Sequence, residues 1–327
     1  MKKIAVFMVG AIVHFWFGSF AYAEYSPPKA ILALKKDHEM RANTSRQQSI
    51  VELRSSTFPH TLEQDSQELE GLRLVLLGKM LLANRQYREA EQVFLKADQN
   101  EKNQTGHHSA AILTNLTRLY MEQNIWEKAE KNLLLQLQAY RREKAEDSFE
   151  IRYTKARLAE TYLAQHKFLL ASETAYSSVY EKDLRQATAE DLLLLGQVEQ
   201  ALRNYPKAET HLKKAMAILE KQKYKSFIDE QTRVKILQQI ADLYTIQGLK
   251  SQADIAQQHA TTAAKRLDRE FFLQDICLIA TNLKENNRLE EAKLSMQFCV
   301  DEATELYGAD SNFTQTYLET LRSLVAP

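Results

Sequence analysis

One alanine recurs six times at nearly regular intervals, and this constrains the fold more than any other feature of the chain. The recurring residues are Ala90, Ala129, Ala171, Ala208, Ala253 and Ala292, separated by 39, 42, 37, 45 and 39 residues. Twelve residues before each of them stands another small residue, namely Gly78, Thr117, Ala159, Gly196, Ala241 and Ala280. Self-similarity at a period of this length indicates an array of stacked structural repeats.

The pattern inside each repeat is helical. In the second repeat, Leu113, Leu116 and Tyr120 are spaced by three and four residues, and Trp126 and Ala129 resume that spacing after a short break. We therefore expect each repeat to be a helical hairpin, in which the two small residues let the helix axes approach closely. A bulky or apolar residue stands three positions before every recurring alanine except in the fifth repeat, which has a lysine there. The fifth repeat should therefore be the loosest.

These motifs resemble the tetratricopeptide repeat, whose pattern is W-x2-L-G-x2-Y followed by A-x3-F. The first repeat carries it as Leu74, Leu77-Gly78, Leu81, Ala90 and Phe94, and the second as Leu113, Leu116-Thr117, Tyr120, Ala129 and Leu133. The fourth repeat departs from it, since Glu199 stands where the pattern has an aromatic residue. The mean interval of about 40 residues, against the usual 34, is similar to the longer, kinesin-light-chain-like form.

The resemblance covers roughly residues 71–308 and implies an all-α fold, a right-handed α-solenoid of about six TPR-like helical hairpins with a C-terminal capping helix. The expected domains are a signal peptide (1–23), an N-terminal helical or partly disordered segment (24–60), the TPR-like solenoid (61–309) and the capping helix (310–327). Within the N-terminal segment, residues 29–42 and 46–55 could each form a short helix.

The N-terminus has the three parts of an export signal. Lys2 and Lys3 precede an apolar stretch over residues 4–20, and Ala21-Tyr22-Ala23 is a small-x-small cleavage site. This predicts an exported bacterial protein, periplasmic or secreted, with the signal cleaved after Ala23. The alternative is an inner-membrane anchor formed by residues 4–20. No later segment is apolar enough to span a membrane, so no span is expected in the mature chain.

The charge balance excludes one class of partner. The chain has 43 basic and 43 acidic residues, and removal of residues 1–23 leaves 41 basic residues against 43 acidic ones. A nucleic-acid-binding protein needs a basic surface to neutralise phosphates, so no nucleic-acid partner is expected.

Two cysteines remain in the mature chain, Cys277 and Cys299. They fall on the two consecutive helices of the sixth repeat, so a disulfide is possible in an exported protein. The alternative is two small buried side chains with free thiols, and the sequence alone favours this second interpretation. Two cysteines are too few for a four-ligand zinc site.

The sequence contains no motif typical of catalysis. The stretch from Gly71 to Met80 superficially resembles a phosphate-binding loop, but six residues separate its glycines and Met80 replaces serine or threonine. His107 and His108 lack an evident third metal ligand. We therefore expect no enzyme activity, no cofactor and no metal.

In the family that the chain resembles, the first helix of each pair lines a concave groove that holds peptides or partner helices. Carried over to this sequence, the groove residues would be Lys79, Leu82, Asn115, Arg118, Met121, Tyr153, Arg157, Glu160, Gln197, Gln200, Gln238, Asp242 and Thr281. Lys79, Arg118 and Arg157 should form a ladder of cations suited to a carboxylate-bearing peptide.

The expected function is therefore that of an exported protein–protein interaction scaffold that binds a peptide or a partner helix, of unknown identity, in this groove. The alternative is an accessory or degenerate domain of a cell-envelope enzyme complex.

Overall fold

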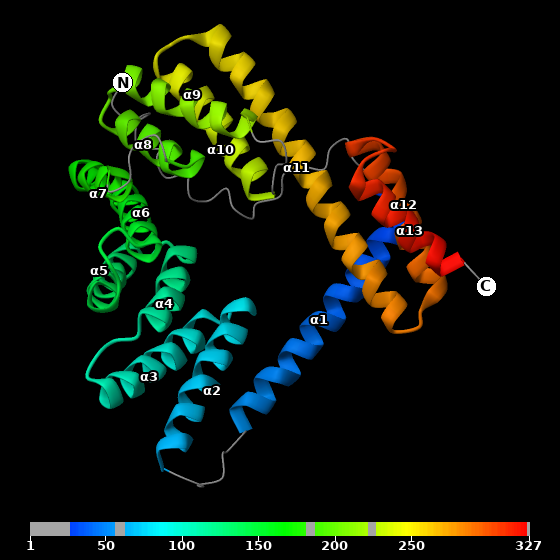
Figure 1. Ribbon diagram of the computed structural model, residues 1–327, viewed down its shortest axis with the longest axis horizontal. Coiled ribbons are helices and arrows are strands. Elements are labelled where there is room, and N and C mark those ends of the chain that lie inside the picture. Colours follow the sequence, from blue (N-terminus) through cyan, green and yellow to red (C-terminus); the bar gives the residue numbers. More distant parts are fainter. Residues whose placement is uncertain (1–26, 56–62, 181–186, 222–226, 326–327) are drawn as a thin grey trace. The chain divides into compact units, whose positions relative to one another are not determined.

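The computed structural model describes residues 27–55, 63–180, 187–221 and 227–325, and these ranges form thirteen helices and no strand (Figure 1). The signal peptide predicted for residues 1–23 lies outside the described residues. The helices are α1 (Lys29–Ser55), α2 (Glu63–Ala83), α3 (Tyr87–Thr105), α4 (Ala110–Glu122), α5 (Trp126–Glu143), α6 (Phe149–Ala164), α7 (Phe168–Tyr180), α8 (Ala189–Ala201), α9 (Tyr205–Lys221), α10 (Phe227–Ile246), α11 (Lys250–Glu285), α12 (Leu289–Tyr307) and α13 (Asn312–Val325).

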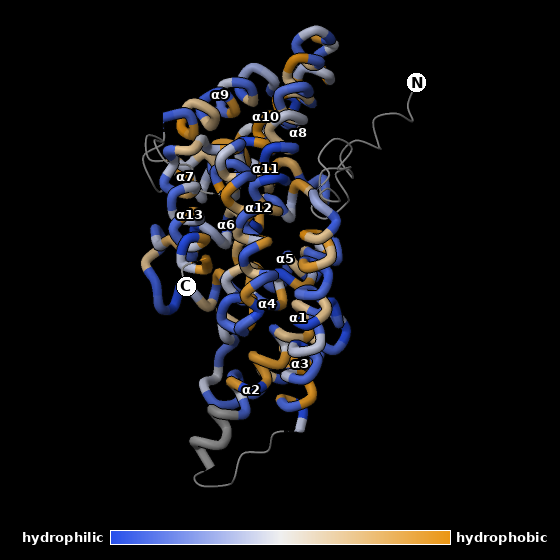
Figure 2. The backbone as a smooth tube through the Cα atoms, turned by 90° about the vertical axis from the view of Figure 1, so that its right-hand side faces the viewer, coloured by the Kyte–Doolittle hydropathy of each residue, from blue (hydrophilic) through white to orange (hydrophobic). Residues whose placement is uncertain are grey.

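Consecutive helices pack in pairs, which confirms the predicted all-α solenoid. Repeats 1 to 4 are the pairs α2–α3, α4–α5, α6–α7 and α8–α9, and each second helix packs on the first helix of the next repeat. Polar and apolar residues are interleaved along these helices, as amphipathic helices require (Figure 2). No helix within the described ranges is both long and apolar enough to span a bilayer.

Two compact subdomains divide the described residues. The first subdomain comprises residues 46–257, and the second comprises residues 27–45 and 258–325. Helices α1 and α11 contribute residues to both. The division therefore falls within the repeat array, inside α11.

The small residues of each repeat lie where the two helices meet. The recurring alanines of repeats 1–4 and 6 are completely buried, whereas Ala253 is 8% exposed, which agrees with a looser fifth repeat. A Cβ atom added to Gly78 would lie 2.5 Å from the Phe94 ring, and one added to Gly196 would lie 2.8 Å from the Leu212 side chain. The helix axes therefore approach too closely at these positions for a larger side chain.

The turn inside every repeat has the same backbone conformation. The residue five positions before each recurring alanine is left-handed, with φ between 58° and 73°; these residues are Arg85, Asn124, His166, Arg203, Gly248 and Asn287. The next N–H donates to the carbonyl five residues back in all six repeats, as Ile125 does to Tyr120 at 2.8 Å. This is the hydrogen bond of a Schellman turn, and it fixes the register of all six repeats.

Two glycine substitutions should have opposite effects because their backbones differ. Gly248 has φ 73°, Gly71 lies inside α2, and a Cβ atom at either site would meet no other atom within 4 Å. Gly248→Ala should lower the free energy of unfolding by about 1 kcal/mol through the left-handed backbone alone. Gly71→Ala should raise it by about 0.5 kcal/mol, because alanine is the better helix former. Chemical denaturation of both variants checks this, and a loss of stability in Gly71→Ala would contradict it.

A tyrosine–glutamate hydrogen bond links repeats 1 and 2, repeats 3 and 4, and repeats 4 and 5. Tyr120 donates to Glu91 of the preceding repeat at 2.7 Å, and Tyr244 donates to Glu209 at 2.9 Å. Between repeats 3 and 4 the tyrosine belongs to the preceding repeat and the glutamate to the following one. Glu199 takes the tyrosine position and accepts a hydrogen bond from Tyr176 of the preceding repeat.

The departure of Glu199 from the repeat pattern thus has a structural explanation. Its side chain is buried, and Asn204 Nδ2 donates a second hydrogen bond to it at 2.7 Å. A buried carboxylate needs such donors to offset the loss of water. Glu199 therefore preserves the link between the repeats with donor and acceptor reversed.

Two helices are longer than the sequence indicated. Residues 29–55 form the single helix α1 instead of two short ones. Its first part packs in the second subdomain, where Ile31 is buried, and its last part packs in the first subdomain, where Ile50 is buried. Helix α11 runs for 36 residues and serves both as the second helix of repeat 5 and as the first helix of repeat 6.

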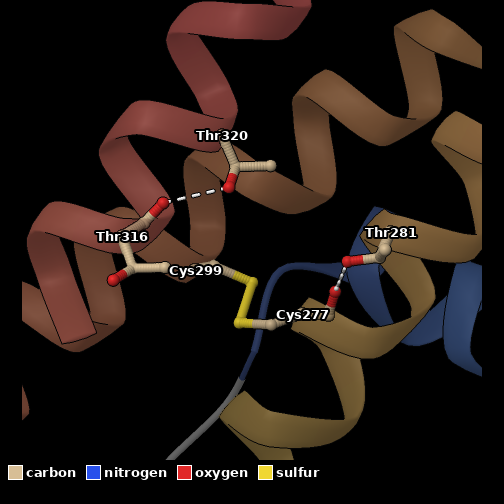
Figure 3. The surroundings of a disulfide bond; sticks show 5 residues. All are labelled: Cys277, Thr281, Cys299, Thr316 and Thr320. Atoms are coloured by element: carbon tan, nitrogen blue, oxygen red, sulfur yellow. Dashed lines mark hydrogen bonds between the residues drawn. A yellow bond between two sulfur atoms is a disulfide. The ribbon is translucent and has the colours of Figure 1, made fainter.

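The second subdomain contains a disulfide, and the preference for two free buried thiols is therefore wrong. The sulfur atoms of Cys277 (α11) and Cys299 (α12) are bonded, with their Cα atoms 5.8 Å apart. Thr316 and Thr320 of α13 lie beside Cys299, and Thr281 lies one turn after Cys277 (Figure 3). The prediction that both cysteines are buried did not distinguish a disulfide from two free thiols, because Cys277 and Cys299 are both buried and bonded. The bond joins the two helices of repeat 6.

Candidate partner-binding face

The first helices of repeats 1 to 5, α2, α4, α6, α8 and α10, lie together on one side of the first subdomain. Figure 1 shows α4, α6, α8 and α10 inside the curve of this subdomain, and α5, α7 and α9 outside it. Side chains connect neighbouring first helices directly: Arg157 of α6 contacts the Met121 sulfur of α4 at 3.2 Å, and Thr232 of α10 donates to Glu190 of α8 at 3.0 Å. We call the accessible side chains of these five helices the inner face.

The register of the repeats sorts the residues on this side of the first helices, buried Leu194 and Gln239 included, into three rows. Six positions before each small residue stand Leu72, Ala111, Tyr153, Glu190 and Lys235. Two positions before it stand Leu76, Asn115, Arg157, Leu194 and Gln239, and one position after it stand Lys79, Arg118, Glu160, Gln197 and Asp242. Each row therefore places equivalent residues of successive repeats side by side.

The part of the inner face that belongs to repeats 1–3 is apolar and cationic. Leu72, Leu76 and Tyr153 are 62%, 50% and 50% exposed. Phe149 is also exposed, and its ring stacks on that of Tyr153 at a centroid distance of 5.8 Å. Large apolar side chains normally avoid water, so such a cluster on one face is typical of an interaction surface.

The cations of this region form a shorter ladder than expected. Lys79 and Arg118 are exposed and equivalent in register, and Arg118 Nε lies 3.5 Å from Glu122 Oε1. Arg157 belongs to a different row and donates to Glu160 Oε2 at 2.5 Å. The side chain that stands in register with Lys79 in the third repeat is therefore an acid, Glu160, and the predicted three-membered ladder is reduced to two members.

The part of the inner face that belongs to repeats 3–5 is polar and internally paired. Gln239 donates to Gln200 at 2.8 Å, and Gln197 donates to Gln239 at 3.4 Å. Burial lowers the pKa of Lys235, an effect opposed by Glu160 and Glu190, and burial raises the pKa of Asp242. Lys235 is thus half-buried and interacts with Glu160 and Glu190, whereas Asp242 remains exposed.

Several predicted groove residues need separate comment. Leu82 is buried, at 2% exposure, in the core of repeats 1 and 2, so its assignment as a contact residue was wrong. It lies on the face of α2 that turns toward α3 and α4. Met121 and Gln238 are half-buried, and Asn115 donates to the Ala111 carbonyl at 2.9 Å. Thr281 lies in the second subdomain and donates to the Cys277 carbonyl.

Sequence reasoning missed three exposed apolar residues, Leu72, Leu76 and Phe149. The signal was present, because positions 72, 76 and 79 are spaced by four and three and so share one face of α2. The repeat motif concentrates on buried positions, and for that reason it did not reveal them.

The histidine pair of the loop between repeats 1 and 2 is explained by a local contact. His108 Nδ1 lies 2.6 Å from Asp98 Oδ2, and the Ser109 N–H donates to the other carboxylate oxygen at 3.2 Å. Within the described ranges, no three acidic, histidine or cysteine side chains are grouped so as to hold a metal ion.

No protein-family profile matches this sequence, and no curated protein matches it either. Solved structures do match the fold. BtubC (BKLC) from P. vanneervenii has a TM-score of 0.52 at 18% identity, over 70% of this chain and 92% of that one. A tetratricopeptide repeat protein from Parabacteroides merdae has a TM-score of 0.52 at 14% identity, over 91% of this chain and 100% of that one.

The TPR-like repeats of a protein from Podosopora anserina that is described as a putative kinesin light chain have a TM-score of 0.50 at 18% identity, over 61% of this chain and 97% of that one. At such low identities the similarity concerns the fold alone. The chain is thus similar in fold to TPR-like repeat proteins, including the kinesin-light-chain-like form.

Proposed function

We propose that this chain is an exported interaction scaffold that holds a segment of a partner protein on its inner face. The observation that carries the proposal is the set of exposed apolar side chains on the inner face of repeats 1–3, with Leu72, Leu76 and Tyr153 each at least half exposed. The stacked pair Phe149 and Tyr153 would supply the aromatic anchor that protein interfaces favour.

The cations of the same region indicate the chemistry of the partner. Lys79 and Arg118 are exposed beside the exposed apolar side chains, and each can donate to a carboxylate. A segment with apolar side chains and at least one acidic residue would complement this surface. Exposed charge pairs contribute little to affinity, so the apolar contacts should dominate the binding free energy and the cations should mainly set orientation and association rate.

Substitutions on the inner face should weaken binding of a captured partner. Replacing Phe149 and Tyr153 with alanine should raise the Kd by about tenfold or more, as for aromatic hot spots. Replacing Lys79 and Arg118 with alanine should raise the Kd by about threefold and reduce its salt dependence. Isothermal calorimetry at two salt concentrations measures both effects.

The outer helices offer a matched control. Leu95 of α3 and Leu134 of α5 both stand five positions after a recurring alanine and are 48% and 42% exposed. Their replacement with alanine should leave the Kd unchanged. If this control abolished binding while the inner-face variants retained it, the partner would bind the second helices and the proposal would fail.

Export is the second part of the proposal. It is supported by the tripartite N-terminus and by the disulfide between Cys277 and Cys299, since disulfides persist in oxidising compartments. We expect protein from the periplasm or the medium to begin at Glu24. Intact mass spectrometry of a fractionated cell tests this, and a membrane-bound chain that retains residues 4–20 would support the anchored alternative instead.

A further inference from the structure

The sixth repeat lacks the preceding neighbour that repeats 2 to 5 have. The first helices α4, α6, α8 and α10 each pack on the second helix of the preceding repeat. The first helix of repeat 6 is the C-terminal part of α11, and the second helix of repeat 5 is the N-terminal part of the same helix. Two consecutive parts of one continuous helix cannot pack side by side. The hairpin formed by residues 270–307 therefore needs another helix to cover its core.

Residues 29–45 of α1 provide this cover within the second subdomain. Ile31 is 1% exposed and belongs to the same apolar core as Phe272 and Ile276 of α11. Lys35 Nζ lies 2.7 Å from Asp275 Oδ2 and 4.9 Å from the centroid of the Phe272 ring.

A third contact reaches the turn before α12. Arg288 Nη1 donates to Asp37 Oδ2 at 3.1 Å. The buried anchor Ile31, the partly buried Leu34 and two ion pairs thus hold this part of α1. Charged groups placed in this way determine which partner fits and in what orientation, while the apolar anchor supplies most of the affinity.

These contacts form a self-contained set. Leu34 is partly buried and packs against the same core, whereas Leu32 and Met40 are 43% and 56% exposed. Residues 46–55 of the same helix belong to the core of the first subdomain, where Ile50 is buried. The docking of residues 29–45 therefore rests on a short segment, whose ion pairs to Asp275 and Arg288 are made with the last hairpin.

We propose that the last hairpin carries a helix-docking site, separate from the inner face, which residues 29–45 of the same chain fill and which the same segment of a second copy can fill instead. The contacts of Ile31, Lys35 and Asp37 are identical in the two arrangements. Two quantities decide which arrangement predominates. One is the effective concentration of residues 29–45 near the docking site of their own chain, and the other is the concentration of second copies in solution. This inference does not depend on the proposed partner segment.

Two variants of the mature full-length chain with complementary defects test the proposal. Ile31→Asp should release residues 29–45 and leave the docking site on the last hairpin intact. The double variant Asp275→Lys with Arg288→Glu should destroy the site by charge reversal and leave α1 intact. Leu32→Asp, one residue from Ile31 on the exposed side of α1, is the matched control.

Multi-angle light scattering and hydrogen exchange give the readouts. When each variant is studied without a partner variant, we expect faster exchange over residues 29–45 in Ile31→Asp and unchanged exchange there in Leu32→Asp. An equimolar mixture of the two defective variants should form a 1:1 dimer of twice the monomer mass, while each variant alone should remain a monomer. The proposal is overturned if residues 29–45 of Ile31→Asp stay protected, or if the mixture contains only monomers while both variants keep their helical circular dichroism.

Discussion

Ala129→Arg should be among the most damaging single substitutions in the first subdomain, with a loss of about 4 kcal/mol in the free energy of unfolding. Ala129 has no exposed surface and lies in the core that repeats 1 and 2 share. Arginine would overpack the contact between α4 and α5 and would place a charge in an apolar site without a partner. For a subdomain of about 200 residues, the melting temperature should fall by roughly 10 °C.

Gln138→Arg is the matched control for Ala129→Arg. Gln138 is exposed on the same helix, α5, so the same charge is added without burial. Thermal melts followed by circular dichroism compare the two variants. Because each repeat contacts mainly its neighbours, hydrogen exchange should show the loss of protection concentrated in repeats 1–3. Equal melting temperatures for the two variants would mean that the assigned packing of α5 is wrong.

Removing the disulfide should destabilise the second subdomain by about 3 kcal/mol, the value expected from loop-closure entropy for its sequence separation of 22 residues. The bond joins α11 and α12, and it limits the freedom of repeat 6 in the unfolded chain. In a subdomain with fewer than about 100 residues, such a loss corresponds to a fall of roughly 15 °C in melting temperature.

The double substitution Cys277→Ala with Cys299→Ala is the variant to compare. Hydrogen exchange should become faster over residues 258–325 in this variant and in the wild-type chain after reduction, while repeats 1–4 remain protected. Reductant should have no further effect on the variant. Unchanged exchange over residues 258–325 would show that the bond contributes nothing to the stability of the native subdomain.

The repeats themselves were predictable because their determinants are local. A small residue is required wherever two helix axes approach closely, and this made Gly196 and Ala208 visible in the sequence. The turn needs a left-handed residue at a fixed distance from the alanine, and five of the six repeats use a non-glycine residue there. For that reason the position of the turn could be predicted from the spacing of the repeat residues, but no recurring glycine marked it.

The features that were not predicted depend on contacts between distant parts of the chain or on the absence of a break. No glycine or proline occurs between Gly248 and Gly308, so nothing in the sequence interrupts α11, and only the assumption of six separate hairpins suggested a turn there. The role of α1 depends on the Lys35–Asp275 ion pair, across 240 residues, which no local pattern can reveal.

The candidate site was predicted in part for a similar reason. Helical spacing places Lys79 and Arg118 on the inner face, and the structure finds both exposed there. The same spacing did not show that Leu82 would be covered by neighbouring helices, or that Arg157 would pair with Glu160. Exposure depends on how adjacent repeats pack, and a pattern within one repeat does not contain that information.

The most direct test of the inner-face proposal is site-specific photo-crosslinking in the native cell. A photoreactive amino acid is placed at Leu76 or Tyr153 on the inner face, and at Leu95 or Leu134 on the second helices, in otherwise wild-type chains. We expect the two inner positions to crosslink the same partner protein through one contiguous segment that contains apolar and acidic residues, and the two outer positions to give no such product. Crosslinks to a common partner from Leu95 and Leu134, with none from Leu76 and Tyr153, would contradict the proposal.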